Sequence, residues 1–398
     1  MKIKGKYGSA ILYATHVDDV TKEQVLELMN QRFVEKLNVR IMADCHAGAG
    51  CVIGTTMNVK DSCVPNLVGV DIGCGMLTVS LGKRKIDFAK LDKFIMDNIP
   101  TGEKIHDTVK PTIVNYKEMY CYENLKHKKR FDYSLGTLGG GNHFIEIDKD
   151  DEDNLYLVIH TGSRNLGKQV CEYYMKVAND NLIRRNNNII KDLVARLRTQ
   201  GKREQIQLEV QKINSNYASV NKDLLPLYGD DFNNYLHDMD ICQKFAWENR
   251  EAIANKILEF LGLDLFNLSH FHTVHNYINM NDMILRKGAI SAYKGEMVLI
   301  PINMRDGSII AVGKSNKKYN YSAPHGAGRI ISRHKAKKNI SLEDFKESMK
   351  GIYSSCVCMS TIDESPFAYK DINDIIPNIL PTVDIIKIIK PVYNFKAK

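Results

Sequence analysis

The stretch Val68-Gly69-Val70-Asp71-Ile72-Gly73-Cys74-Gly75 places two potential metal ligands directly after an apolar segment. Residues 67–70 predict a strand, and the glycines that follow permit a tight turn. Asp71 and Cys74 stand three positions apart across that turn, so both side chains can point at one ion. An isolated aspartate in a turn usually caps backbone amides, and an isolated cysteine beside glycine usually packs, so a metal site requires further donors.

Three histidines occur in a similar setting. His143 follows the glycine-rich run 136–141, His160 ends a predicted strand over 155–159, and His275 follows two other histidines. A single histidine at a strand end is usually a hydrogen-bonded structural residue. Three of them together with the aspartate–cysteine pair indicate a metal site.

The five predicted metal ligands are Asp71, Cys74, His143, His160 and His275. A thiolate can bridge two ions, so these side chains can build a two-metal site. Two ions about 3.5–4 Å apart stabilise both the attacking and the leaving oxygen in phosphoryl transfer. Thiolate and imidazole ligands taken alone favour zinc.

Strands and helices are partly segregated along the chain, which predicts an α+β fold. The expected helices cover 22–36, 88–98, 237–261 and 342–351, the first opened by a capping box at Thr21 and Gln24. The expected strands cover 39–42, 51–53, 67–70, 76–81, 283–286, 297–301 and 308–312. We expect a single large domain over 1–398, with mixed or antiparallel sheets around the two-metal site. Residues 180–222 are expected to form a charged helical hairpin insertion, broken near Gly201.

The net charge of +8 is concentrated in basic segments. Residues 307–342 carry eight lysines or arginines and no acid, which suits a phosphate-rich partner, and 176–222 carry ten bases against four acids. A solvated charged face explains the second segment equally well.

No apolar run is long enough to span a bilayer, and the N-terminal charges are not followed by the apolar segment of a secretory signal. With nine scattered cysteines, we expect reduced thiols, most of them buried, in a cytoplasmic protein.

A series of collinear motifs resembles the RtcB-type RNA-splicing ligases over nearly the whole chain. They are Asp44-Cys45-His46-Ala47-Gly48, the opening stretch from Val68 to Gly75, Gly139-Gly140-Gly141-Asn142-His143-Phe144, His160-Thr161-Gly162-Ser163-Arg164, His275-Asn276, Arg286-Lys287-Gly288-Ala289, His325-Gly326-Ala327-Gly328-Arg329 and Ala368-Tyr369-Lys370-Asp371.

The resemblance implies two Mn²⁺ ions, one held by Asp71, Cys74 and His143 and the other by Cys74, His160 and His275. It implies that His325 is the nucleophile that carries GMP from GTP, and that Asp44 orients it. The further nucleotide contacts that it implies are Asn142, His275, Asn276, Pro301, Asn303, Met304, Ser308, Gly326, Ala327, Gly328, Tyr369 and Lys396.

The reaction implied is the joining of an RNA 3′-phosphate or 2′,3′-cyclic phosphate end to a 5′-hydroxyl end, in tRNA splicing or RNA repair. Neutral imidazole can attack the α-phosphorus of GTP, which gives a labile phosphoramidate. Arg164 and Arg329 are the predicted clamps for RNA phosphates, because guanidinium binds phosphate through two parallel hydrogen bonds. In the segment 301–308, Ile302 and Arg305 replace small residues of the family's nucleotide loop, which leaves the strictness of the GTP preference open.

Two other functions compete with ligation. One is a two-metal RNA phosphodiesterase or cyclic-phosphate hydrolase that has lost nucleotide transfer, and the other is an RNA-binding module without catalysis. The presence of His325, Asp44, Tyr369 and Lys396 argues against the hydrolase, and the full set of metal ligands argues against the binding module. The natural RNA, the oligomeric state and a requirement for an activating protein partner stay open.

Overall fold

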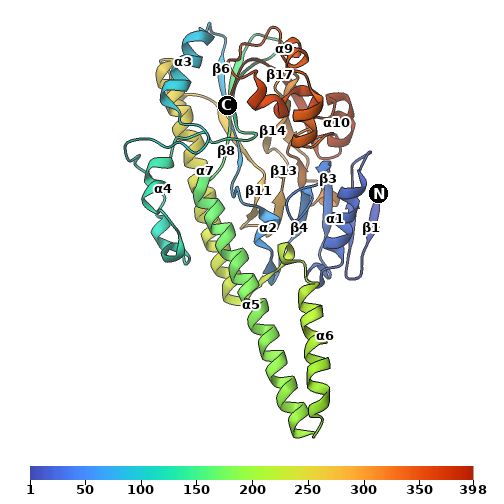
Figure 1. Cartoon of the computed structure of the whole chain (residues 1–398). Helices are drawn as coiled ribbons and strands as arrows, with labels where there is room; N and C mark the ends of the chain where they lie inside the picture. Colours follow the sequence, from blue (N-terminus) through green and yellow to red (C-terminus); the bar gives the residue numbers. More distant parts are fainter. Residues whose placement is uncertain (398) are drawn as a thin grey trace.

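The computed structural model describes residues 1–397 (Figure 1). The α-helices of these residues are α1 (Asp19–Met29), α2 (Pro65–Val68), α3 (Phe88–Asn98), α4 (Lys129–Ser134), α5 (Arg164–Thr199), α6 (Ile206–Ala218), α7 (Gly229–Phe260), α8 (Arg333–Asn339), α9 (Leu342–Ser348) and α10 (Ile372–Ile379). The strands are β1 (Lys2–Lys4), β2 (Ser9–Leu12), β3 (Val39–His46), β4 (Ile53–Asn58), β5 (Ser62–Cys63), β6 (Gly75–Gly82), β7 (Phe144–Lys149), β8 (Leu155–Thr161), β9 (Leu227–Tyr228), β10 (His270–Val274), β11 (Asn276–Asn279), β12 (Ile284–Lys287), β13 (Ala289–Ser291), β14 (Met297–Asn303), β15 (Gly307–Gly313), β16 (Ser322–Pro324) and β17 (Val383–Lys396).

Two large sheets form the body of the molecule. The first has the strand order β1-β2-β3-β4-β12-β11, in which only the β2–β3 pair is parallel. The second is antiparallel, in the order β10-β6-β8-β7-β17-β15-β14. The strands β13 and β16 form a separate two-stranded sheet, and so do β5 and β9. The predicted α+β fold with mixed and antiparallel sheets is confirmed.

Helix α7 packs against both parts of the core. Its buried Ile253, Ile257 and Leu258 join the apolar cluster of β6, β7, β8 and α3, whereas Tyr235, Met239 and Phe245 belong to the cluster shared with α5 and the first sheet. Because its buried residues recur along most of its length, α7 lies between the two clusters and can position side chains for the strand ends.

The predicted helical hairpin is confirmed. Helices α5 and α6 lie against each other, and the turn between them includes Gly201 in a left-handed conformation (φ 72°). Figure 1 shows the outer part of the hairpin projecting away from the sheets as an isolated arm.

Three local predictions are wrong. Residues 67–70 do not form a strand, because Pro65 begins the short helix α2, which ends at Gly69 (φ 98°). The strand expected at 51–53 begins only at Ile53. The first helix is α1, shorter than 22–36, and its N-cap is Asp18, whose carboxylate accepts from the Thr21 amide at 2.9 Å.

The remaining elements differ mainly at their ends. The helix expected at 237–261 is the C-terminal part of α7, which begins eight residues earlier at Gly229.

Eight of the nine cysteines are buried, among them Cys242 in α7. Among the described residues, no helix is both long and apolar enough to cross a membrane.

Candidate metal centre and nucleotide pocket

Two groups of metal-ligand atoms meet where β6, β8 and the segment before β11 come together. Asp71, Cys74 and His143 form one group, and Cys74, His160 and His275 form the other, with the ligand atoms of each group within 4.8 Å of one another. The structure therefore brings together all five predicted metal ligands, and Cys74 belongs to both groups.

The distances between donor atoms fit a bound cation. His143 Nε2 lies 2.9 Å from Asp71 Oδ2 and 3.5 Å from Cys74 Sγ, and His160 Nε2 lies 3.3 Å from Cys74 Sγ. Donors at such separations can share one ion at bond lengths of about 2.0–2.3 Å.

The ring orientations also fit metal binding. His143 Nδ1 lies 2.8 Å from the Leu138 carbonyl and His160 Nδ1 lies 3.3 Å from the Asn142 carbonyl. Since a carbonyl only accepts, each Nδ1 carries the proton and each Nε2 presents a lone pair. The Nε2 atoms of His160 and His275 face each other at 3.4 Å, an arrangement that a cation between them would stabilise.

Burial affects the histidine and the cysteine ligands in opposite ways. It lowers the pKa of His160 and His275 well below the ordinary value, with further contributions from neighbouring rings, so both imidazoles are neutral. Burial and the Asp71 carboxylate raise the pKa of the Cys74 thiol. A bound cation would counter that effect and favour the thiolate.

Two neighbouring residues of α7 support the ligand-bearing loops. Asn249 Oδ1 accepts from the amides of Gly136 and Thr137, at 2.7 and 3.1 Å, ahead of His143. Arg250, fully buried, donates to the carbonyls of Gly73 (2.8 Å) and Thr161 (3.0 Å). One helix thus fixes the loops that carry ligands of both groups.

Close backbone approach explains two of the glycines. A Cβ on Gly162 would lie 2.1 Å from Asp71 Oδ1, so only glycine lets the carboxylate reach His143. Gly328 has a φ of 76°, and a Cβ there would lie 2.2 Å from the Asp44 carbonyl oxygen. The chain after His325 can therefore pass directly over the strand that carries Asp44.

His325 lies beside the metal centre and is held by a buried carboxylate. Asp44 Oδ2 accepts from His325 Nδ1 at 2.6 Å and from the His325 amide at 3.1 Å, and Asp44 is fully buried. The His325 and His275 rings are 4.9 Å apart. With its proton on Nδ1, the ring presents the Nε2 lone pair to incoming groups.

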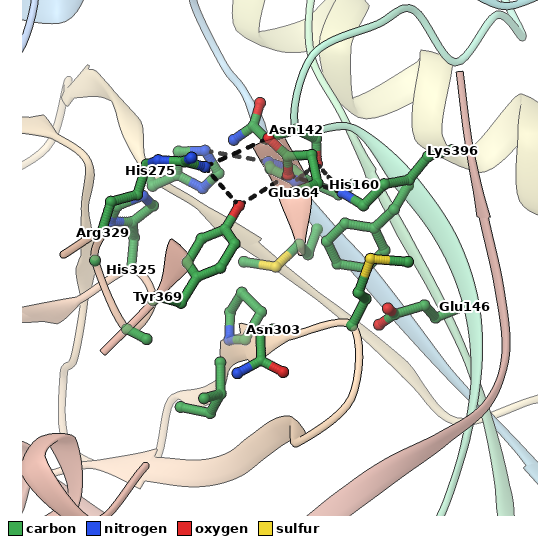
Figure 2. A pocket seen from close by; sticks show the side chains of 18 of the residues that line it. Asn142, Glu146, His160, His275, Asn303, His325, Arg329, Glu364, Tyr369 and Lys396 are labelled. Carbon is green, nitrogen blue, oxygen red and sulfur yellow. Dashed lines mark hydrogen bonds and ion pairs between the residues drawn. The ribbon is translucent and has the colours of Figure 1, made fainter. Parts of the chain in front are cut away.

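A pocket opens from His325 and the predicted metal ligands His160 and His275 across to Lys396 on β17 (Figure 2). The predicted nucleotide residues that line it are Asn142, His275, Pro301, Asn303, Met304, His325, Gly326, Ala327, Gly328, Tyr369 and Lys396. Arg329 also lines this pocket, where its guanidinium lies 5.0 Å from the Tyr369 ring centre and donates to the Tyr369 hydroxyl at 3.2 Å.

Glu364 is the centre of a buried charge cluster in the pocket wall. Its carboxylate accepts from Tyr369 Oη at 2.8 Å, from Lys396 Nζ at 3.1 Å and from the Arg333 guanidinium. Burial alone would raise the pKa of Glu364, but Lys396, Arg333 and Arg329 together with the Tyr369 hydroxyl lower it to about 2. The cluster fixes two of the predicted nucleotide contacts, Tyr369 and Lys396.

A second acid, Glu146, faces the pocket from β7. Burial raises the pKa of Glu146 to about 7, although Lys396 and the Asn394 amide oppose that shift. A buried carboxyl group with few charged partners is suited to accept hydrogen bonds from a ligand.

The segment 301–308 is compatible with a nucleotide despite its larger side chains. Asn303 Oδ1 accepts from the amides of Arg305 and Asp306, both at 2.9 Å, which closes a tight turn. The Arg305 side chain pairs with Asp306 at 2.7 Å and does not line the pocket, so of the two larger residues only Ile302 borders it.

Three of the predicted nucleotide and RNA contacts, Asn276, Ser308 and Arg164, do not line this pocket. Ser308 is fully buried on β15, and Asn276 donates to the Asp71 carbonyl at 3.4 Å and accepts from the Gly288 amide at 3.0 Å. Arg164 donates to the Gly102 carbonyl at 2.7 Å and lines, with Asp71, a separate cavity.

Several site residues were not predicted from the sequence, namely His46, Glu146, Asn249, Arg250, Arg333 and Glu364. Glu146 sits three residues after His143, between Ile145 and Ile147 on β7, and an acid between two apolar strand residues was a usable signal. Asn249 and Arg250 interrupt the apolar face of α7, whereas nothing local to Glu364 distinguishes it from a surface acid.

The fold and the site define an α+β protein with two groups of potential metal ligands beside a histidine-lined pocket. The model of the family described as "tRNA-splicing ligase RtcB" matches residues 24–125 and 114–397. The chain belongs to the RtcB family.

Named relatives match over most of both chains. RNA-splicing ligase RtcB of Escherichia coli (strain K12) is 29% identical, with 96% of this chain and 95% of the relative covered. The tRNA-splicing ligase RtcB of Methanococcus maripaludis is 28% identical, with 94% and 90% covered. RNA-splicing ligase RtcB homolog 1 of Entamoeba histolytica is 27% identical, with 84% and 75% covered.

Proposed function

We propose that this protein is a GTP- and Mn²⁺-dependent RNA ligase that joins 3′-phosphate or 2′,3′-cyclic phosphate ends to 5′-hydroxyl ends. The observation that carries the proposal is the position of His325. Its Nδ1 is bound to the buried Asp44, and its ring lies 4.9 Å from the metal ligand His275, in the wall of a pocket lined by the predicted nucleotide residues. A hydrolase that used only the metal centre would have no need of this histidine.

In the first step, His325 Nε2 attacks the α-phosphorus of GTP. An N–P bond forms, the bond to the bridging oxygen breaks, and pyrophosphate leaves with the electron pair. Throughout this step, Asp44 accepts a hydrogen bond from the Nδ1–H group of His325. This bond holds the ring in one tautomer and stabilises the positive charge that develops on it.

In the second step, an oxygen of the RNA 3′-phosphate attacks the phosphorus held by His325 and displaces the imidazole. The RNA 5′-hydroxyl then attacks the activated 3′-phosphate, loses its proton and expels GMP. A cyclic phosphate end first requires hydrolysis to the 3′-phosphate. Metal ions at the centre would supply charge neutralisation and in-line alignment of the reacting oxygens.

The donor set supports two ions that share Cys74, one with Asp71 and His143 and one with His160 and His275. Thiolate and imidazole fit zinc by softness, and the family resemblance favours manganese. We propose manganese, because an octahedral ion leaves open positions for phosphate oxygens beyond the protein ligands.

Guanine selection is assigned to Glu146. Guanine presents two adjacent donors, N1–H and the N2 amino group, whereas the corresponding edge of adenine presents an acceptor at N1. A buried carboxylate on the pocket wall can accept both guanine hydrogens and repels the adenine nitrogen. Lys396 and Tyr369, fixed by Glu364, would flank the base.

The RNA is expected to reach the centre from the cavity that Asp71 shares with Arg164, with Arg164 contacting its phosphates and Arg329 contacting phosphate from the nucleotide side. Asn276 and Ser308, which do not line the nucleotide pocket, would act indirectly, by holding the backbone around it in place. We further propose that residues 1–398 act as one domain in the cytoplasm.

Incubation with α-labelled GTP and Mn²⁺, followed by denaturation, tests the proposal. Wild-type protein should retain an acid-labile label, His325→Ala should retain none, and His237→Ala on the outer part of α7 should label normally. Label that survives His325→Ala would refute the nucleophile. RNA cleavage that needs metal but no GTP, without any labelling, would identify a phosphodiesterase instead.

A further inference from the structure

The outer half of the hairpin makes almost no contact with the body of the protein. The buried residues of α5 lie between Leu166 and Ala178, and beyond them only Leu197 is buried, while α6 has none. The arm that projects in Figure 1 is therefore supported by a single helix–helix contact. An exposed arm of this kind contributes little to the core.

Helix α5, whose outer part forms one side of the arm, begins beside the candidate metal centre. Arg164, the first residue of α5, lines one cavity together with the metal ligand Asp71. Arg198 lies 34 positions further along the same helix. At a rise of about 1.5 Å per residue, it lies about 51 Å from the start of the helix.

Three basic residues form a line along the outer part of α5. Arg184, Lys191 and Arg198 are exposed and follow one another at intervals of seven residues. Seven residues make nearly two helical turns, so the three side chains lie on the same side of the helix, about 10 Å apart. We call these three residues the basic stripe.

The stripe is not neutralised within the protein. Among residues 1–397, none of its three members forms a salt bridge, although Asp180 lies four positions before Arg184 and Asp192 adjoins Lys191. By contrast, Lys212 on α6 pairs with Glu209 at 2.6 Å. Three unpaired cations in one row are repulsive in the free protein and attract a row of anions.

We propose that the basic stripe binds the phosphate backbone of a structured RNA whose broken end lies at the metal centre. The inference rests on the proposed function for the position of that end. The neighbouring side chains on this side, at three and four positions after Arg184 and Lys191, are Asn187, Asn188, Val194 and Ala195, which offer amides and two small apolar groups and no large apolar patch. That composition favours a phosphate backbone over a protein partner.

The stripe also defines the substrate class. An RNA reaches Arg198 only if it extends about 50 Å from the reacting end as a continuous structured element. The protein should therefore bind long helical RNAs more tightly than short strands with the same ends.

Binding measurements with a triple variant test the inference. Arg184→Gln, Lys191→Gln and Arg198→Gln are combined, since glutamine keeps the helical propensity. The matched control removes three positive charges elsewhere, by Lys2→Gln, Lys4→Gln and Lys6→Gln at exposed positions of the N-terminal segment. Each protein is titrated with a long stem-loop RNA and with a short single strand, both ending in a 3′-phosphate, at several salt concentrations.

The stripe variant should bind the long RNA about 10- to 100-fold more weakly, and the slope of log affinity against log salt should fall by about 2–3. Its affinity for the short strand and its labelling by GTP should match the wild type, as should all properties of the control. Unchanged affinity for the long RNA, or an equal loss for both RNAs, would overturn the inference. If labelling and ligation fail in the wild type while the length-dependent loss persists, the proposed function fails and the RNA-binding stripe stands.

Discussion

Asp44 Oδ2 lies 2.6 Å from His325 Nδ1, and the same oxygen accepts the His325 backbone amide. The two residues are 281 positions apart in sequence, and Asp44 is fully buried on β3. A buried carboxylate that contacts both the ring and the backbone of one histidine fixes its position, its rotamer and its tautomer at once.

Replacing the carboxylate should remove this control without disturbing the packing. Asp44→Asn is expected to slow GTP labelling of His325 by about 100-fold or more, because an amide can present its NH₂ to Nδ1 and move the proton to Nε2. Single-turnover labelling measures the rate. Asp92→Asn is the control, since Asp92 is a buried acceptor for Tyr393 remote from the site. Equal rates for both variants would contradict the assigned role.

The shared position of Cys74 predicts an unequal loss of metal among ligand variants. Cys74→Ala should abolish binding of both Mn²⁺ ions, whereas Asp71→Ala and His275→Ala should each lose one, because each contributes to a single group. Metal content after dialysis gives the stoichiometry. Cys51→Ala, another buried cysteine, should retain two ions. Two ions in Cys74→Ala would exclude the bridging arrangement.

Arg250 should affect metal affinity without being a ligand. Arg250 donates to the Gly73 and Thr161 carbonyls through the single atom Nη1, and the shorter side chain in Arg250→Lys places no nitrogen at that position, so the ligand loops should loosen and Mn²⁺ affinity should fall by about 10- to 100-fold. Calorimetric titration measures that affinity. Arg286→Lys tests whether loss of any buried guanidinium has this effect, since Arg286 contacts Ser322 and Asp282 instead. An identical decrease in both variants would argue against a specific role.

Nucleotide selection should depend on the ionisation of Glu146. Its pKa is raised to about 7, so the carboxylate form becomes dominant as the pH rises through that value. GTP affinity should therefore increase across neutral pH in the wild type. Glu146→Gln should lose about 10- to 100-fold of the preference for GTP over ATP and show a flat pH profile. Competition binding at several pH values tests this, and a pH dependence that persists in the variant would assign it to another group.

The Glu364 cluster should contribute to stability above acidic pH. The pKa of Glu364 is lowered from 4.5 to about 2, so its contribution is complete above pH 4.5 and is lost as the pH falls toward 2. Glu364→Gln should destabilise the protein by about 3–5 kcal/mol at neutral pH, and the difference should shrink on acidification. Urea unfolding measures it, with the exposed Glu343→Gln as control. A difference independent of pH would contradict the ionised cluster.

The sequence predicted what depends on local chemistry. Glycine turns and clustered histidines pointed to the five side chains that the structure brings together as two candidate metal-binding groups, and helix periodicity located the hairpin and α3. It did not predict contacts that form only after folding, such as Arg250 with the Gly73 turn or Glu364 with Lys396, because these join residues from distant elements. The strand expected at 67–70 failed because its apolar composition suits strand and helix alike, and Pro65 decides between them.

Strand β17 lies between β7 and β15, and Lys396 at its end enters the nucleotide pocket, pairing with Phe144 more than 250 positions earlier. Such distant pairing forms slowly, because a long loop must close before any contact compensates for the lost chain entropy. The predicted ligands Cys74, His143 and His160 can assemble from nearer segments, because His143 and His160 lie only 69 and 86 positions after Cys74. During folding, the pocket should therefore form in two kinetic phases. The protein should bind metal in the first phase, and it should bind nucleotide only after β17 has paired with its neighbours.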